Sequence, residues 1–222
     1  MIDWTPFWLS FKLAGVTTVI LLLIGIPLAW WLSRTKTAIK PILETIVALP
    51  IVLPPTVIGF YILWALAPDS YLGSILHELF GIKLVFSFWG IVVGSVIYSL
   101  PFMVQPLQSG FESVPKSLYE ASFIAGKGEL ETLVRVILPN IKGALATAVI
   151  ITFAHTLGEF GVVLMVGGSI PGETKVASIA IYELVESLDF RRAHIYSLVM
   201  VAISFAILLA VYSIKRRDDA KS

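Results

Sequence analysis

The chain has 222 residues, of which 57% are hydrophobic and only 14% are charged, whereas a typical soluble protein has about 25% charged residues. We therefore predict an all-α integral membrane protein with a single membrane domain over residues 1–222 and little chain left for a soluble domain. A net charge of +1 argues against a nucleic-acid partner. The absence of cysteine excludes disulfides, thiolate nucleophiles and cysteine metal sites.

Five apolar segments are each long enough to cross a bilayer, which takes about 20 residues of helix. They cover residues 13–33, 45–68, 84–111, 143–166 and 193–214. Four of them contain no charged residue, and the remaining one is interrupted only by His155 and Glu159. We therefore expect about five transmembrane helices. The first residues are acidic and aromatic, and no small-residue cleavage site follows the first apolar run, so we expect no removable signal peptide.

The basic residues predict the orientation, because the cytoplasmic loops of membrane proteins carry an excess of Lys and Arg. Eleven basic residues follow the first, third and fifth spans: Arg34, Lys36, Lys40, Lys116, Lys127, Arg135, Lys142, Lys215, Arg216, Arg217 and Lys221. The other side keeps five: Lys12, Lys83, Lys175, Arg191 and Arg192. We predict that the amino terminus lies outside the cell membrane and the carboxyl terminus lies in the cytoplasm.

Prolines interrupt the second span at Pro54 and Pro55, where they remove backbone donors and free carbonyl groups. A broken helix at membrane depth is tolerated where it is packed in protein or lines a watery cavity. Pro54, Pro55 and Thr56 therefore form a candidate segment of a translocation pathway. A packing kink is the alternative.

Two shorter segments with helical spacing are predicted on the outer side. Residues 71–80 place leucines and an isoleucine on one face, which is typical of a helix lying in the membrane interface. Residues 177–188 also repeat apolar side chains at helical spacing, but they are too few and too polar to span. The second segment is expected to cap the outer mouth of the protein or to re-enter it.

The loop of about residues 112–140 contains the sequence EASFIAGKGELETLVRVILP at positions 120–139. Ser117 and Glu120 have the spacing of a capping box, and Gly126 supplies a left-handed stop, which predicts a helix of about two turns. So short a helix is stabilised by lying against another surface. An ordinary polar connection is the alternative. The spacing from Glu120 to Pro139 resembles the cytoplasmic EAA loop of ABC importer permeases, where an ATPase subunit docks.

The fourth span contains Glu159, with His155 one helical turn earlier and Thr152 close by. Ionisable groups at membrane depth usually face a bundle interior or a water-filled path, and residues four apart share a helix face. These residues therefore indicate a pathway or gate. The alternative is a polar contact between helices that only fixes their packing. A catalytic pair is less expected, because no nucleophile, metal ligand or oxyanion donor accompanies it.

Several motifs together are similar to the molybdate permease branch of the molybdate and sulfate importer family. They are LPIVLPPTV at residues 49–57, GEFG at 158–161, SIPGET at 169–174 and AIY at 180–182. The resemblance implies a type I ABC importer permease fold with a cytoplasmic coupling helix. It also implies a complex of two copies of this chain, a cytoplasmic ATPase dimer and an external molybdate-binding protein.

The resemblance also implies roles for single residues. ATPase coupling is expected of Glu120, Ala121, Ser122, Gly126, Leu138 and Pro139. The pathway or gate is expected at Pro54, Pro55, Thr56, Thr152, His155, Gly158, Glu159, Phe160 and Gly161. The binding protein is expected to meet Pro171, Gly172, Glu173 and Thr174. A carboxylate is a poor ligand for an anion, so we expect Glu159 to hold the gate through hydrogen bonds near the outer end of the pathway, with Phe160 packing beside it, rather than to touch molybdate.

No catalytic residue, metal or bound cofactor is expected on this chain. Gly167 and Gly172 have the spacing of a phosphate-loop glycine pair, but Glu173 and Thr174 follow where Lys and Ser or Thr are needed. ATP and Mg are therefore expected on the partner ATPase. Two residues depart from the family pattern: Ser122 replaces a frequent alanine, and Phe123 replaces an arginine that is frequent in the molybdate branch. Phe123 could shift how the coupling helix sits in the ATPase.

Three rival interpretations stay open. A tungstate or sulfate importer would share the fold and the mechanism. An ATP-independent, proton-coupled transporter would use Glu159 as its proton site and leave the EAA-like loop unexplained. An intramembrane enzyme would use His155 and Glu159 without any dependence on an ATPase.

Overall fold

A computed structural model of the protein describes residues 2–81 and 83–219, except for the side chains of residues 76, 77, 79, 80 and 210–219. Within these residues every regular element is helical. The elements are α1 (Thr5–Arg34), α2 (Lys40–Val52), α3 (Pro55–Leu66), α4 (Tyr71–Phe80), α5 (Phe88–Ser113), α6 (Lys116–Ile124), α7 (Glu129–Thr132), the π-helical η1 (Leu133–Ile137), α8 (Leu138–Asn140), α9 (Lys142–Leu157), α10 (Gly161–Gly167), α11 (Ala177–Glu186) and α12 (Phe190–Asp219).

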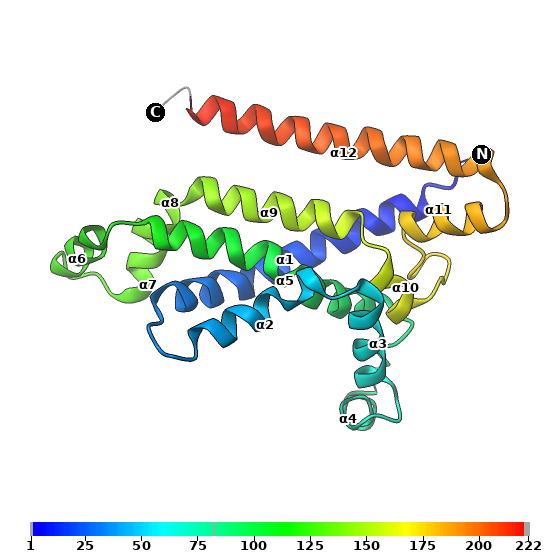
Figure 1. Ribbon diagram of the computed structural model, residues 1–222, viewed down its shortest axis with the longest axis horizontal. Helices are drawn as coiled ribbons and strands as arrows, with labels where there is room; N and C mark the ends of the chain where they lie inside the picture. Colours follow the sequence, from blue (N-terminus) through cyan, green and yellow to red (C-terminus); the bar gives the residue numbers. More distant parts are fainter. Residues whose placement is uncertain (1, 82, 220–222) are drawn as a thin grey trace.

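The long helices α1, α5, α9 and α12 run along the length of the molecule (Figure 1). Short helices occupy its ends, with α6 and α7 at one end and α10 and α11 at the other, and we call these the α6 end and the α11 end. Helix α5 lies at the centre and contacts α1, α2, α9 and α10. Two glycines permit close packing in this bundle, because a methyl group at Gly25 would lie 2.7 Å from Met103 and one at Gly110 would lie 2.6 Å from Ala144.

Among the described residues, three helices are long and apolar enough to cross a membrane by themselves: α1, α5 and the Phe190–Leu209 part of α12. Two further spans are bent, by 110° between α2 and α3 and by 81° between Glu129–Asn140 and α9. Counting each bent pair as one span gives up to five, as the sequence predicts. The break between α2 and α3 falls at Leu53 and Pro54, which confirms that the prolines interrupt this span.

The prediction of one continuous span over residues 143–166 is wrong. Helix α9 ends at Leu157, and α10 begins only at Gly161. Phe160 precedes α10 with a φ of −129° and a ψ of −60°, which is not helical. Since Glu159 and Phe160 lie between two helices, their backbone groups need partners from other parts of the fold.

The outermost long helix, α12, packs loosely against the rest of the molecule. Only 11% of its apolar window is buried, and it presents Leu198, Val201 and Phe205 as exposed side chains. An apolar face of this extent is typical of a surface covered by lipid or by another protein.

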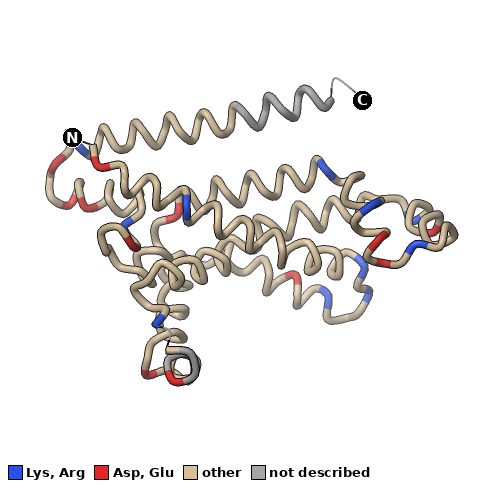
Figure 2. Tube along the Cα trace, turned by 180° about the vertical axis from the view of Figure 1, so that it is seen from behind, with Lys and Arg blue, Asp and Glu red and all other residues tan. Residues whose placement is uncertain are grey.

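Lys and Arg gather toward the two ends of the bundle (Figure 2). At the α6 end, Arg34 pairs with Glu129 at 3.4 Å and Lys40 pairs with Glu112 at 3.1 Å. The predicted cytoplasmic side chains of Lys215, Arg216, Arg217 and Lys221 lie outside the described residues. The described basic residues that were predicted to be cytoplasmic belong to the α1–α2 connection and the segment from α6 to the start of α9.

Candidate functional site

The break between α2 and α3 lies against the break between α9 and α10, and we call these two helix pairs the broken spans. A methyl group at Gly161, the first residue of α10, would lie 2.6 Å from the Cβ of Pro55, the first residue of α3. A methyl group at Gly59 would lie equally close to the Cβ of Met165. The glycines therefore allow α3 and α10 to pack in direct backbone contact, and they bring the predicted pathway segments 54–56 and 158–161 together.

Glu159 lies at this junction with its side chain only 5% exposed. Neither of its carboxylate oxygens has a hydrogen-bond partner among the described residues, so the expectation that this side chain holds the gate through hydrogen bonds is wrong. Ser95 of α5 adjoins the carboxylate, although no hydrogen bond of normal geometry joins the two. The backbone of Glu159 is better satisfied: its N–H donates to the Thr156 carbonyl at 3.2 Å, and its carbonyl accepts from the Ser178 hydroxyl at 2.6 Å.

His155 does not pair with Glu159, contrary to the expectation from their spacing. Its Nδ1 lies 3.0 Å from the Ser99 hydroxyl, and its ring stacks on Phe102 with centroids 3.9 Å apart. The helix ends between the two residues, so they do not share one face. Thr152 is fully buried, with a hydroxyl that has no partner among the described residues. The pathway residues thus form two environments, one around Ser99 and one around Glu159.

The turn between α10 and α11 is held by Thr174. This side chain is 0% exposed, its hydroxyl donates to the Gly167 carbonyl at 2.8 Å, and it accepts from the Ile170 N–H at 2.9 Å. The expectation that Thr174 faces a partner is therefore wrong, because its short polar side chain staples the turn from within. Pro171, Gly172 and Glu173 are exposed, and Gly172 has a φ of +78°.

Glu183 of α11 fastens this turn from the other side. Its carboxylate accepts hydrogen bonds from the Ser169 hydroxyl and from the Lys175 ammonium group. Partial burial acts to raise the pKa of Glu183, but the hydrogen bonds from Lys175 and Ser169 outweigh it and hold the pKa below its ordinary value. Glu183 is therefore ionised at neutral pH and bridges the two ends of the turn.

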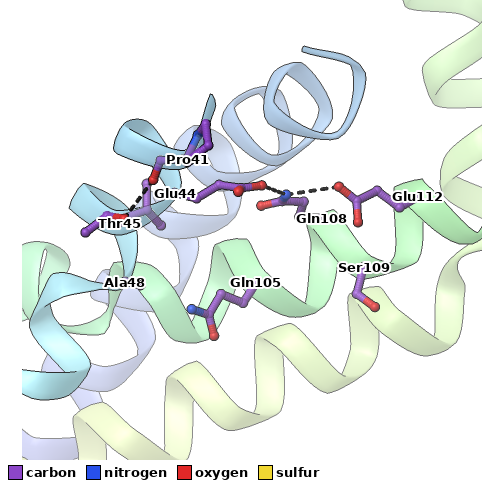
Figure 3. Close-up of a pocket in the computed structure, with 9 residues that line it drawn as sticks. Pro41, Glu44, Thr45, Ala48, Gln105, Gln108, Ser109 and Glu112 are labelled. Atoms are coloured by element: carbon purple, nitrogen blue, oxygen red, sulfur yellow. Dashed lines mark hydrogen bonds between the residues drawn. The ribbon is translucent and has the colours of Figure 1, made fainter. Parts of the chain in front are cut away.

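A polar groove of about 520 Å³ opens between α2 and α5 (Figure 3). Its lining includes Glu44, Gln105, Gln108, Ser109 and Glu112. The Gln108 amide donates to Glu44 at 2.6 Å and to Glu112 at 3.0 Å. Glu44 of α2 and Glu112 of α5 place a carboxylate on each wall and repel an anion, so this groove does not have the chemistry of an oxyanion site.

The EAA-like loop forms a nine-residue helix, α6, as predicted. Its start differs from the prediction: Pro115 is the N-cap, no side chain caps the helix, and Ser117 lies within its first turn. Its end agrees, because Gly126 has a φ of +77° and the N–H groups of Gly126 and Lys127 donate to the carbonyls of Phe123 and Ser122.

The residues predicted to couple to an ATPase divide into two groups. Glu120, Ala121 and Gly126 are exposed, whereas Ser122 is buried and its hydroxyl lies 2.8 Å from that of Thr132. Leu138 and Pro139 follow the π-helical turn η1, in which the Leu138 N–H donates to the Leu133 carbonyl. Two large apolar side chains of α6 are also exposed, Phe123 at 41% and Ile124 at 88%.

Residues 21–219 match the family model described as "Binding-protein-dependent transport system inner membrane component". The chain belongs to this family. It is 45% identical to the molybdenum transport system permease protein ModB of Azotobacter vinelandii, over 96% of this chain and 95% of that protein. It is 32% identical to the putative molybdenum transport system permease protein YvgM of Bacillus subtilis, over 93% and 91%. A probable sulfate transport system permease protein of Chlorella vulgaris is 30% identical, over 93% and 77%.

The fold is that of a type I ABC importer permease, as expected. A bacterial ABC transporter involved in the import of the acidic polysaccharide alginate matches with a TM-score of 0.79 at 18% identity, over 96% of this chain and 78% of that one. The chain is thus a multi-pass membrane permease.

Sequence reasoning about this permease missed several partners of the candidate site. Ser95 and Ser99 stand four residues apart in the apolar α5, a spacing that could have indicated a polar face toward the fourth span. Ser178 and Tyr182 of α11 share the same spacing, and Tyr182 lies 5.1 Å from the Phe160 ring. No local pattern ties Ser178 to a carbonyl 19 residues earlier.

Proposed function

We propose that this chain is the permease subunit of an ATP-driven ABC importer that carries molybdate into the cell. The observation that carries this proposal is the 45% identity, over nearly the whole of both chains, to a molybdenum transport permease. The contact between the α2–α3 break and the α9–α10 break supports it independently, because such breaks provide polar backbone groups at membrane depth.

The oxyanion crosses beside the junction of residues 54–56 and 158–161. A dianion entering a dry medium of low dielectric faces a penalty of tens of kcal/mol, so its path must be wet and lined by donors. The backbone N–H groups of the first turn of α10, which have no acceptor within the helix, and the hydroxyl of Thr56 supply such donors transiently. Glu159 holds the gate in shape through its backbone N–H and carbonyl, and its carboxyl group is a poor ligand for an anion.

Coupling to ATP hydrolysis takes place at α6. The exposed Phe123 and Ile124 form an apolar surface on a short helix, and such a surface gains free energy when an ATPase subunit covers it. ATP and Mg bind to that ATPase. Closure of the ATPase dimer moves α6 and biases the permease between inward-open and outward-open states.

The complex contains two copies of this chain, a cytoplasmic ATPase dimer and an external binding protein that contacts Pro171, Gly172 and Glu173. The amino terminus lies outside the cell membrane, and the α6 end faces the cytoplasm. The basic residues at the α6 end support this orientation.

Tungstate and sulfate are the second candidate cargo, favoured by the 30% identity to a sulfate permease. All three ions are tetrahedral dianions, and the binding protein discriminates among them. A proton-coupled transporter that uses Glu159 is the further alternative, and it predicts uptake without any ATPase.

The deciding experiment measures ATP hydrolysis and uptake by the permease–ATPase complex in lipid vesicles. Binding protein loaded with molybdate, tungstate or sulfate is added in turn, and empty binding protein is the control. Stimulation by the molybdate-loaded form, together with uptake that needs ATP, is the expected result. Uptake by the permease alone, or stimulation by sulfate only, would overturn the proposal.

A further inference from the structure

We propose that α11 transmits contact at the turn 169–175 to the helix break at residues 158–160, and that Ser178 is the residue that positions the break. This inference rests on the proposed function, because it assigns a signal path between the binding-protein side and the gate. Three sets of contacts carry it: turn to α11, α11 to the break, and α11 to α1.

The turn is a rigid body fastened to α11. Within it, the N–H groups of Glu173, Thr174 and Lys175 all donate to the Ile170 carbonyl, at 3.1, 3.0 and 3.0 Å. The Glu183 carboxylate then holds Ser169 and Lys175, which flank the exposed residues 171–173. A force applied to the exposed residues therefore acts on α11 rather than bending the turn.

A neighbouring face of α11 holds the break. The Ser178 hydroxyl donates to the Glu159 carbonyl at 2.6 Å, and the Tyr182 ring packs against Phe160 with centroids 5.1 Å apart. Ser178 and Tyr182 are one helical turn apart, so both contacts come from one face. The Glu159 carbonyl lies between α9 and α10, where a backbone acceptor without water needs a side-chain donor.

Helix α11 also has a firm pivot on α1. The N–H of Ala177 donates to the hydroxyl of Ser10 at 2.9 Å, and Ser10 is only 1% exposed. Three residues of α11 are buried in the protein: Ala177, Ile179 and Ala180. Anchored at its first residue, α11 moves as one piece, and a small displacement of the turn displaces the partners of Glu159 and Phe160.

The turn 169–175 and α11 together contact both ends of helix α10. At its start, Phe160 lies against Tyr182. At its end, a methyl group at Gly167 would lie 3.0 Å from the Cβ of Thr174 and 2.3 Å from Ile91. Since α10 also packs on α3 through Gly59, a shift of α11 reaches the second broken span as well.

The test compares Ser178→Ala, Glu183→Gln and the double variant in the permease–ATPase complex. Its readout is the ratio of ATP hydrolysis with molybdate-loaded binding protein to hydrolysis without it. A variant that merely lowers the amount of folded complex reduces both rates alike and leaves the ratio unchanged. Ser187→Ala is the matched control, because its hydroxyl makes only a local bond to the Leu184 carbonyl.

We expect each single variant to reduce the ratio about fivefold, because losing one hydrogen bond of ordinary strength shifts a two-state equilibrium by about this factor and uncouples the turn from the break. The double variant should lose no more than either single one, because both cut the same path. Ser178→Thr keeps the hydroxyl and should restore most of the ratio, whereas Ser187→Ala should leave it unchanged.

Several results would overturn the inference. One is a Ser178→Ala ratio equal to wild type, and another is a double variant whose loss is the product of two independent losses. Glu183→Gln removes a partly exposed charge, so it provides a test even where Ser178→Ala yields no complex. A wild-type complex that loaded binding protein fails to stimulate would instead refute the proposed function.

Discussion

One methyl group added at Gly161 tests whether the two broken spans must touch. The Cβ of an alanine there would lie 2.6 Å from the Pro55 Cβ, whereas carbon atoms pack favourably at about 3.5–4.0 Å. The proline ring is fixed and cannot rotate away, so α3 and α10 must separate by about 1 Å. Overpacking of this kind costs about 1–3 kcal/mol.

Gly161→Ala should therefore lower the thermal unfolding temperature of the purified permease and reduce molybdate uptake by the reconstituted complex. Gly15→Ala in α1 is the matched control, because no atom lies within 4 Å of the added methyl group. Alanine also favours a helix interior over glycine by up to about 1 kcal/mol, so this control should be neutral or slightly stabilising. Equal unfolding temperatures and equal uptake for the two variants would refute the close junction.

Three further predictions concern the two ends of the bundle. Gly126→Ala should weaken assembly with the ATPase, because the φ of +77° at this position costs a non-glycine residue about 1–2 kcal/mol. Gly128 has a φ of −73°, so Gly128→Ala should leave assembly unchanged. Equal ATPase affinities of the two variants would contradict this prediction. Ile124→Ser should leave the stability of the isolated permease unchanged, because this side chain is 88% exposed on α6. It should lower the affinity for the ATPase about tenfold in a titration. An unchanged affinity would place the docking surface elsewhere. The pKa of Glu183 is lowered below 4.5 in the folded protein, so its carboxylate stabilises the fold above pH 4.5, and this stabilisation is lost as the pH falls through the lowered pKa. On acidification the unfolding temperature of the wild type should therefore fall more steeply than that of Glu183→Gln. Parallel curves of unfolding temperature against pH would argue against the bridge.

The apolar runs predicted the spans α1 and α5 and the exposed α12, because the bilayer imposes a length that composition alone reveals. The break at Pro54 was also predictable, since proline lacks the N–H that a helix interior needs. The second break, at Gly158, left no such mark, because a glycine inside an apolar run looks like ordinary membrane helix.

The errors at His155, Ser117 and Thr174 share one physical cause. Each prediction placed a polar side chain from its neighbours in the sequence: by helical spacing for His155 and Ser117, and by membership of an exposed turn for Thr174. His155 instead meets Ser99, which is 56 residues away, and Thr174 turns inward to Gly167. Ser117 lost its expected cap role because the helix begins at Lys116, after Pro115, whose carbonyl accepts from the Leu118 N–H.

The order of elements along the chain explains how two distant surfaces can act on one gate. Helix α9 starts directly after the loop that carries α6, and it ends at the break; its 16 residues form a rod of about 24 Å. The turn 169–175 and α11 reach the same break from the other end, through Ser178 and Tyr182. In the proposed mechanism the ATPase moves the end of α9 that lies next to α6. The binding protein moves the turn 169–175 and α11, which contact the break at the other end of α9. A continuous fourth span would pass the motion straight through, whereas the break at residues 158–160 lets the two inputs meet where α10 packs on Pro55 and opens or closes the path.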